Sequence, residues 1–253
     1  MLKKVAVFLT GFMLFSAVAA ANSYNEIAGG AQKFSGTVGI YAKNLKTGKS
    51  LAYNGDAVFP AASTAKLVVA MALYKYLYPA ASPTKKSLYD ESVDDMIVVS
   101  GNDSYGAMLG EIDAVRPDAL KRVEKDLRLK KTMTHSEAAY KRYNYHSVTT
   151  PYEMASVLEN IYRGRYLSKQ KSAELKDKLA NTVFHDEIPR YMETPVYHKV
   201  GALDNLLCDV GIVDDGKDQI LISVYTLTDQ PAEYASDYIA KTAAQAYNAL
   251  RRK

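Results

Sequence analysis

The feature that most constrains the fold is a change of pattern along the chain. Strand-like runs at residues 36–41 and 51–53 come before a long region with helical periodicity, and three further strand-like runs follow Pro195, at 196–203, 208–213 and 219–228. Runs rich in β-branched and apolar residues between turn residues are typical of strands. Strands at both ends that flank a helical stretch predict one sheet built from both chain ends.

We therefore predict an α/β (α+β) protein. Its antiparallel β-sheet of about five strands would be flanked by helices and interrupted by an inserted all-helical domain. The predicted sheet domain comprises residues 22–59 and 195–253, and the predicted helical domain comprises residues 60–194.

Local signals place several helices. The segment AASTAKLVVAMALYKYL has only Lys66 and Lys75 as charged residues, which predicts a nearly buried helix, and a proline-containing loop, AASPTKKSLYD, is expected after it. The sequence TPYE at residues 150–153 predicts a helix start, because it combines a capping threonine, a proline in the first position and a glutamate three residues after the cap. A last helix is expected near residues 236–250.

The N-terminus predicts export. Lys3 and Lys4 precede an apolar run from Val5 to about Ala20, and small residues with A-x-A sequences follow, which is typical of a signal peptide over residues 1–21. The alternative is an uncleaved membrane anchor, for which the run is slightly short against the roughly 20 residues that a bilayer requires. We expect a periplasmic or secreted bacterial protein with no stable membrane anchor.

Composition narrows the classes of function. The chain is 48% hydrophobic and 24% charged, as in globular proteins, and its formal charge of +4 falls to +2 without Lys3 and Lys4, so nucleic acid is not an expected partner. Cys208 is the only cysteine and allows no internal disulfide. We expect no metal, because no HExxH or paired ligand spacing occurs among the histidines, His135, His146, His185 and His198. We also expect no other cofactor, and a monomer.

A Ser-x-x-Lys sequence occurs three times, beginning at Ser63, Ser82 and Ser168. Only Ser63 opens a long apolar helix, where this spacing puts Ser63 and Lys66 on one face a single turn apart. Burial there would lower the pKa of Lys66 from about 10.4 toward neutrality, so that Lys66 could serve as a base for the hydroxyl. Ser82 and Ser168 are interpreted as solvated surface. The alternative for Ser63 is a helix N-cap with a lysine that reaches solvent.

Two further motifs follow in order. Ser100-Gly101-Asn102 lies 37 residues after Ser63, and Lys199-Val200-Gly201 lies 99 residues after Ser100 on a strand-like run. With these motifs the chain resembles the penicillin-recognising serine hydrolases, which include class A β-lactamases and D-alanyl-D-alanine peptidases and carry S-x-x-K, then S-D-N or S-G-N, then K-T-G. The sequences HKVG at 198–201 and DVGIV at 209–213 resemble the class A branch most closely.

The resemblance implies catalytic roles. Ser63 would accept the acyl group, Lys66 would activate it, and Ser100 would pass a proton to the leaving nitrogen. Class A β-lactamases also use a glutamate on a long loop to activate the deacylating water, and Glu137, 14 residues before Pro151, is the candidate. That loop is a few residues shorter here and lacks the usual glutamate-x-x-leucine-asparagine sequence, so an ordinary surface carboxylate is the alternative.

The resemblance also implies substrate-binding residues. Asn102 would hold the substrate amide and Lys199 would attract the substrate carboxylate. Gly201 and Ala202 would line the site, and an N–H near Ala202 would form the oxyanion hole with that of the nucleophile. Val200 stands where the family has threonine, so the hydroxyl that would donate to the carboxylate is missing.

The implied function is an exported serine hydrolase that opens β-lactam amides through an acyl-serine intermediate, without cofactor, acting on a small-molecule β-lactam or a peptidoglycan stem peptide. Gly101, where class A β-lactamases usually have aspartate, favours the alternative of a D-alanyl-D-alanine carboxypeptidase or related peptidoglycan enzyme. A catalytically weak binding homologue is a third hypothesis. The literal K-T-G match, at residues 46–48, precedes Ser63 and lies between two strand runs, so it is expected to be a hairpin turn.

Overall fold

The structure is a computed structural model that describes residues 24–252. The predicted signal peptide, residues 1–21, lies outside the described residues. Between residues 24 and 252, no helix combines the length and the apolar character needed to cross a bilayer.

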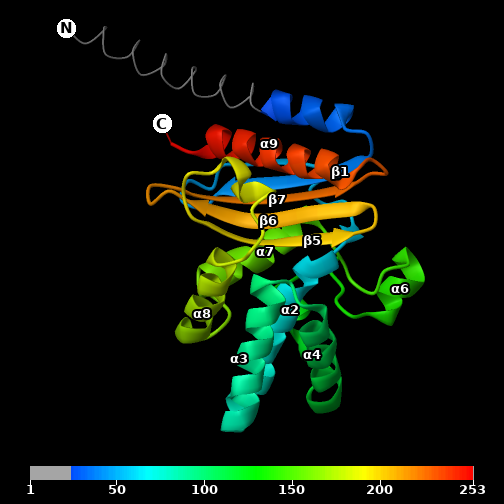
Figure 1. Ribbon diagram of the computed structural model, residues 1–253, viewed down its shortest axis with the longest axis vertical. Coiled ribbons are helices and arrows are strands. Elements are labelled where there is room, and N and C mark those ends of the chain that lie inside the picture. Colours follow the sequence, from blue (N-terminus) through cyan, green and yellow to red (C-terminus); the bar gives the residue numbers. More distant parts are fainter. Residues whose placement is uncertain (1–23, 253) are drawn as a thin grey trace, which may run out of the picture.

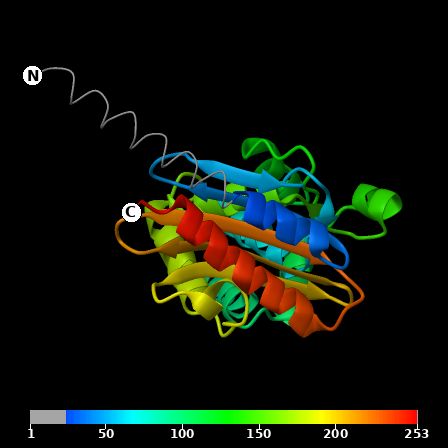
Figure 2. The ribbon, with the colours of Figure 1, turned by 90° about the horizontal axis from the view of Figure 1, so that it is seen from above.

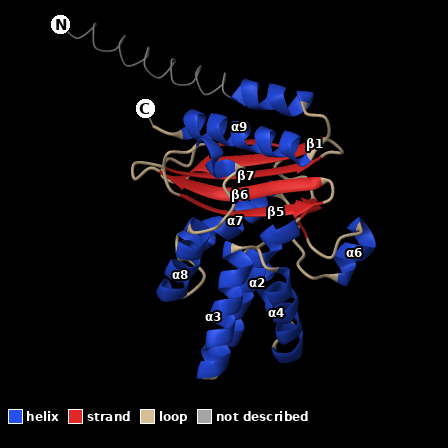
Figure 3. Ribbon diagram, in the orientation of Figure 1, coloured by secondary structure: helices blue, strands red, loops and turns tan. Residues whose placement is uncertain are grey.

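A five-stranded antiparallel sheet forms the centre of the fold, in the order β2-β1-β7-β6-β5 (Figures 1 and 3). Its strands are β1 (Thr37–Asn44), β2 (Ser50–Tyr53), β5 (Val196–Leu203), β6 (Leu206–Asp214) and β7 (Gln219–Leu227). The N-terminal β1 pairs along its whole length with the C-terminal β7. The prediction of one sheet built from both chain ends is therefore confirmed.

The literal K-T-G triplet is a turn. It lies between β1 and β2, which pair as a hairpin with Lys43 opposite Ser50. The Asn44 side chain accepts hydrogen bonds from the N–H groups of Lys46 and Thr47, at 2.8 and 3.0 Å, and Gly48 adopts a φ of +76° that favours glycine. The hairpin expected from the sequence is thus confirmed.

Helices cover both faces of the sheet. One face carries α9 (Ala232–Leu250) and a helix over residues 24–33, both of which lie across the strands in Figure 2. The apolar layer on this side includes Ile40, Ile222 and Val224 from the strands and Ile239 and Ala243 from α9. Apolar side chains from both chain ends therefore close this half of the core.

The other face carries the helical part (Figure 1). Its α-helices are α2 (Ala65–Ala72), α3 (Pro83–Val98), α4 (Asn102–Val115), α5 (Ala119–Asp126), α6 (Glu137–Tyr143), α7 (Pro151–Tyr162) and α8 (Lys169–Ala180). The shorter helical segments here are η1 (Ala62–Thr64), η2 (Leu73–Leu77) and η3 (Tyr78–Ala80). A further one, η4 (Ile188–Tyr191), packs against α9 on the first face, where Ile188 belongs to the apolar layer. A small second sheet, which the sequence did not predict, pairs β3 (Phe59–Pro60) with β4 (Val148–Thr149).

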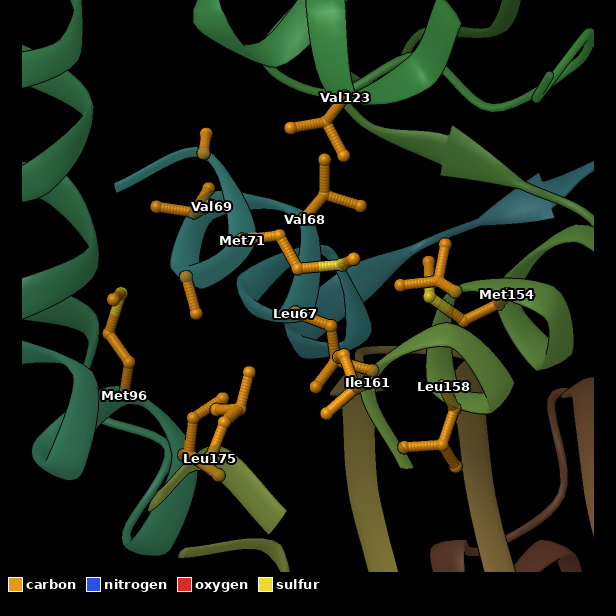
Figure 4. Close-up of a cluster of buried hydrophobic side chains, with 14 of the residues drawn as sticks. Leu67, Val68, Val69, Met71, Met96, Val123, Met154, Leu158, Ile161 and Leu175 are labelled. Atoms are coloured by element: carbon orange, nitrogen blue, oxygen red, sulfur yellow. The ribbon is translucent and has the colours of Figure 1, made fainter. Parts of the chain in front are cut away.

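Helix α2 is the centre of this part, and every one of its residues is buried. Figure 4 shows its apolar side chains packed among those of the neighbouring helices α3, α5, α7 and α8. The nearly buried helix expected from the sequence is therefore present. Its burial matters for the site because Lys66 belongs to the first turn of α2.

Two helix starts are set by local capping. Thr150 caps α7 by accepting a hydrogen bond from the N–H of Glu153 at 3.1 Å, with Pro151 in the first position, as predicted. The prediction of a loop over residues 80–90 is wrong beyond Ser82. Ser82 caps α3, and Pro83 is the first residue of that helix. Proline lacks an N–H, which the first turn of a helix does not need, so it starts this helix rather than preventing it.

Candidate active site

Ser63 lies in η1, the short turn that leads into α2. Its hydroxyl oxygen accepts a hydrogen bond from Nζ of Lys66 at 3.0 Å. Ala62, directly before it, has a φ of +46°, a left-handed value that is uncommon for residues other than glycine. Such strain is found at functional sites, where the surrounding structure holds it.

The two other Ser-x-x-Lys sequences are built differently. Ser82 and Ser168 accept hydrogen bonds from the N–H three residues later and thereby cap α3 and α8. The interpretation of the third sequence as solvated surface is wrong for Lys171, whose side chain is buried and paired with Asp90 and Glu174. The hydroxyl of Ser63 instead contacts a lysine ammonium, so the alternative of an N-cap serine does not describe it.

Lys66 contacts residues of both the first and the second motif. Beyond Ser63, its Nζ donates to the backbone oxygen of Ser100 at 2.7 Å, to the hydroxyl of Ser100 at 3.2 Å and to Oδ1 of Asn102 at 2.8 Å. Burial lowers the pKa of Lys66 to about 8, against the opposing negative charge of Asp95. A neutral amine next to a serine hydroxyl can act as a general base.

Lys199 reaches the same group from β5. Its fully buried Nζ donates to the hydroxyl of Ser100 at 2.9 Å and to the backbone oxygen of Val200 at 2.8 Å. Burial, followed by repulsion from Lys66, lowers the pKa of Lys199 to about 7. Ser100 itself has a φ of +61° in the turn between α3 and α4, and this conformation directs its carbonyl and hydroxyl toward the two lysines.

Gly201 lies where β5 passes the nucleophile. A Cβ at this position would lie 3.0 Å from the backbone nitrogen of Ser63 and 2.9 Å from Sγ of Cys208, so a side chain does not fit. Because β5 is an edge strand, one side of its backbone is open, and the neighbouring Ala202 is exposed. An open edge of this kind can receive a substrate or its developing oxyanion.

Sequence reasoning missed two side chains of this site. The ring of Tyr105 lies 5.5 Å from Nζ of Lys66, and its position one turn after Asn102 on α4 was a signal for a shared helix face. The second is Tyr225, whose hydroxyl lies 2.8 Å from Oγ1 of Thr64, the residue after the nucleophile. No sequence pattern pointed to Tyr225, because it comes from the central strand β7, more than 150 residues away.

Glu137 does not join this group among the described residues. It is the first residue of α6, which stands away from the body of the molecule (Figure 1). Its side chain is 77% exposed and its ion-pair partner is His146, at 3.5 Å. Ser136 caps α6 and so fixes the direction of its first turn. The position differs from the one expected for a residue that activates water beside Ser63.

The fold and the ordered motifs place the chain in the superfamily of penicillin-recognising serine hydrolases. The model of the beta-lactamase enzyme family matches residues 20–80 and 79–250, so the chain belongs to that family. No curated protein matches the sequence significantly.

Solved structures share the fold at low identity. The β-lactamase from Sphaerobacter thermophilus DSM 20745 is 19% identical with a TM-score of 0.73, over 92% of this chain and 97% of that one. A TLA-1 extended-spectrum β-lactamase variant is 16% identical with a TM-score of 0.79, over 91% and 98%. A PBP-A variant, an acyl-enzyme complex with penicillin G, is 22% identical with a TM-score of 0.75, over 90% and 96%.

Proposed function

We propose that this protein is an exported serine hydrolase that opens the amide of β-lactams through an acyl-Ser63 intermediate. The observation that carries the proposal is the contact of Lys66 Nζ with Ser63 Oγ at 3.0 Å, inside a site that lowers the pKa of Lys66 to about 8. A buried lysine of this kind loses its proton far more readily than an exposed one, so it can take the hydroxyl proton as the nucleophile attacks.

The acylation step follows from the contacts. Neutral Lys66 takes the proton of Ser63 as Oγ bonds to the carbonyl carbon, and the N–H groups of Ser63 and Ala202 receive the oxyanion. As the carbon–nitrogen bond breaks, the hydroxyl of Ser100 gives its proton to the leaving nitrogen. Ser100 regains a proton from one of the two lysines that contact its oxygen.

Substrate binding uses the walls of the same site. Asn102 Oδ1 is held by Lys66, which leaves the amide nitrogen of Asn102 to donate to a carbonyl of the substrate. Lys199 supplies positive charge for a substrate carboxylate, with Val200 adding no hydroxyl. Gly201 keeps the edge of β5 close to Ser63, and substrate lies along that edge.

A D-alanyl-D-alanine carboxypeptidase or related peptidoglycan enzyme is the second candidate function, and the position of Glu137 favours it. With this carboxylate exposed on α6, the acyl-enzyme lacks the proposed base for its hydrolysis. Such an enzyme would react with a β-lactam, retain the acyl group and act productively on a stem peptide ending in D-alanyl-D-alanine.

Intact-mass spectrometry after mixing with penicillin G tests both functions. We expect a mass increase by one penicilloyl group that disappears as the drug is hydrolysed, and no increase for Ser63→Ala. A persistent adduct, together with release of D-alanine from a pentapeptide, would support the carboxypeptidase instead. The absence of any adduct and of any turnover of a chromogenic cephalosporin would overturn both and leave the non-catalytic binding homologue.

Export and a monomeric state are part of the proposal. Lys3, Lys4 and the apolar run after them support cleavage near residue 21. N-terminal sequencing of the protein from a periplasmic or culture fraction should begin near residue 22, and a chain that still carries Met1 in the membrane fraction would contradict export. The mass in solution, by light scattering, should be that of one chain.

A further inference from the structure

The second motif contains an unusual packing contact at Gly101. A Cβ built on Gly101 would lie 1.6 Å from Oδ2 of Asp95, 2.4 Å from its Cγ and 2.8 Å from its Oδ1. Two groups cannot share that space. The carboxylate of Asp95 therefore occupies the volume that a side chain at position 101 would take, which is the position where class A β-lactamases usually carry aspartate.

The backbone holds Asp95 in this place. Asp95 lies in the last turn of α3, and its carbonyl accepts a hydrogen bond from the N–H of Gly101 at 2.9 Å. This bond closes the turn in which Ser100 adopts its left-handed φ of +61°. The carboxylate fills the space beside Gly101 in the same turn, which directs both oxygens of Ser100 toward Lys66.

Asp95 also contributes charge to the site. Its negative charge raises the pKa of Lys66 and so opposes the lowering caused by burial. The other groups that face Lys66 are the ammonium of Lys199, which shares Ser100 with it, and the ring of Tyr105 at 5.5 Å. Asp95 is therefore the negative charge that counters the buried ammonium of Lys66, whereas Asp209 and Cys208 have that effect on Lys199.

We propose that Asp95 is a positioning residue of the second motif: its carboxylate takes the place of a side chain at position 101, supports the Ser100 turn and balances the charge of Lys66. The role of Asp95 in the acylation of Ser63 rests on the proposed function. The packing of Asp95 against Gly101 does not, so the packing and the proposed function can be tested separately.

The charge is tested with Asp95→Asn, which removes the negative charge and keeps the shape of the side chain. The control is Asp94→Asn, which removes the same charge from the preceding residue, an exposed partner of Lys178. The NMR titration of the Cε carbon of Lys66, assigned with Lys66→Arg, needs no substrate. We expect its midpoint to fall by about half a pH unit or more in Asp95→Asn and to stay unchanged in Asp94→Asn. Equal midpoints in the wild type and Asp95→Asn would overturn the proposal.

The packing is tested by an exchange of positions. We expect Gly101→Asp alone to lower the acylation rate by penicillin G about tenfold and to lower the melting temperature. The double variant Asp95→Ala with Gly101→Asp should recover most of both. The exchange would be refuted if the double variant had the same acylation rate and melting temperature as Gly101→Asp. It would also be refuted if Gly101→Asp matched the wild type in both quantities. If no form is acylated, the proposed function fails, while the titration and the melting temperatures still decide on Asp95.

Discussion

Lys66 and Lys199 donate to the same oxygen, the hydroxyl of Ser100, at 3.2 and 2.9 Å. Both ammonium groups are buried, and repulsion from Lys66 is one of the causes that lower the pKa of Lys199. Because two such groups interact strongly, they lose their protons as a pair rather than independently. One neutral and one charged lysine is the arrangement that acylation requires, since Ser63 needs a base and a substrate carboxylate needs a cation.

The pair predicts the pH dependence of acylation. The pKa is about 7 for Lys199 and about 8 for Lys66, so the first proton leaves mainly from Lys199, and neutral Lys66 with charged Lys199 is the minor of the two singly protonated forms. That reactive form nevertheless becomes more abundant as the pair loses its first proton, so the rate should rise in this pH range. It should fall again at higher pH, when the second proton leaves and the cation is lost. Stopped-flow acylation with a chromogenic cephalosporin measures this profile. A rate that stays constant from about pH 6 to 9 would contradict the role of Lys66 as a base.

The same burial predicts a cost in stability. The pKa of Lys199 is about 7 in the folded state and 10.5 in the unfolded chain, so between these values the unfolded state binds more protons and stability rises with pH. Lys199→Met removes this cost. Its free energy of unfolding in urea should exceed that of the wild type by a few kcal/mol near pH 6, at about 1.4 kcal/mol per pKa unit, and by much less near pH 10.

The exposed Lys49 gives the control for this experiment. Lys49→Met should leave the free energy of unfolding nearly unchanged at both pH values, because an exposed ammonium is solvated in both states. If Lys199→Met were less stable than the wild type at low pH, the charge of Lys199 would be stabilising rather than costly.

Gly201 is predicted to be essential for the rate. In Gly201→Ala the added methyl group would lie 3.0 Å from the nitrogen of Ser63, so β5 and the nucleophile must move apart. We expect a loss of acylation rate on the order of tenfold or more, with less effect on folding, because misplaced oxyanion donors lose transition-state stabilisation. Gly106→Ala on α4 is the matched control, since nothing lies within 4 Å of its added Cβ. Similar rates for both variants would argue against the close approach.

Val200 predicts a gain of function. Val200→Thr restores a hydroxyl that can donate to a substrate carboxylate, and such a bond to a charged group contributes roughly 1.5 to 3 kcal/mol, or about ten- to a hundredfold. The value of kcat/KM for penicillin G should rise toward this range, and that for penicillin G methyl ester should not. An equal change for the acid and the ester would show that the hydroxyl does not contact the carboxylate.

Glu137 is predicted to be dispensable. Its side chain is 77% exposed on α6 and pairs with His146, so Glu137→Gln should leave acylation and deacylation within about twofold of the wild type. The lifetime of the penicilloyl adduct, followed by intact mass, measures deacylation directly. A much longer lifetime in the variant would mean that α6 brings this carboxylate to the acyl group during the reaction.

Much of the fold was readable from the sequence, because the relevant signals are local. Strand patterns at both chain ends predicted the sheet, and the Thr150-Pro151 start of α7 and the hairpin turn at residues 46–48 depend on neighbours within a few residues. The choice of Ser63 among three Ser-x-x-Lys sequences was also local, since only this serine precedes a long, mainly apolar helix.

Only the tertiary structure decided the contacts between residues that lie far apart in the chain. The sequence orders the motifs, but only packing shows that Lys199 shares the Ser100 hydroxyl with Lys66, that the carboxylate of Asp95 fills the space at Gly101, and that α6 turns its first residue to solvent. These outcomes depend on how side chains that are distant in sequence pack and exclude one another, which no pattern in neighbouring residues encodes. The lowered pKa of Lys66 differs from them, because the apolar helix around it already predicted burial.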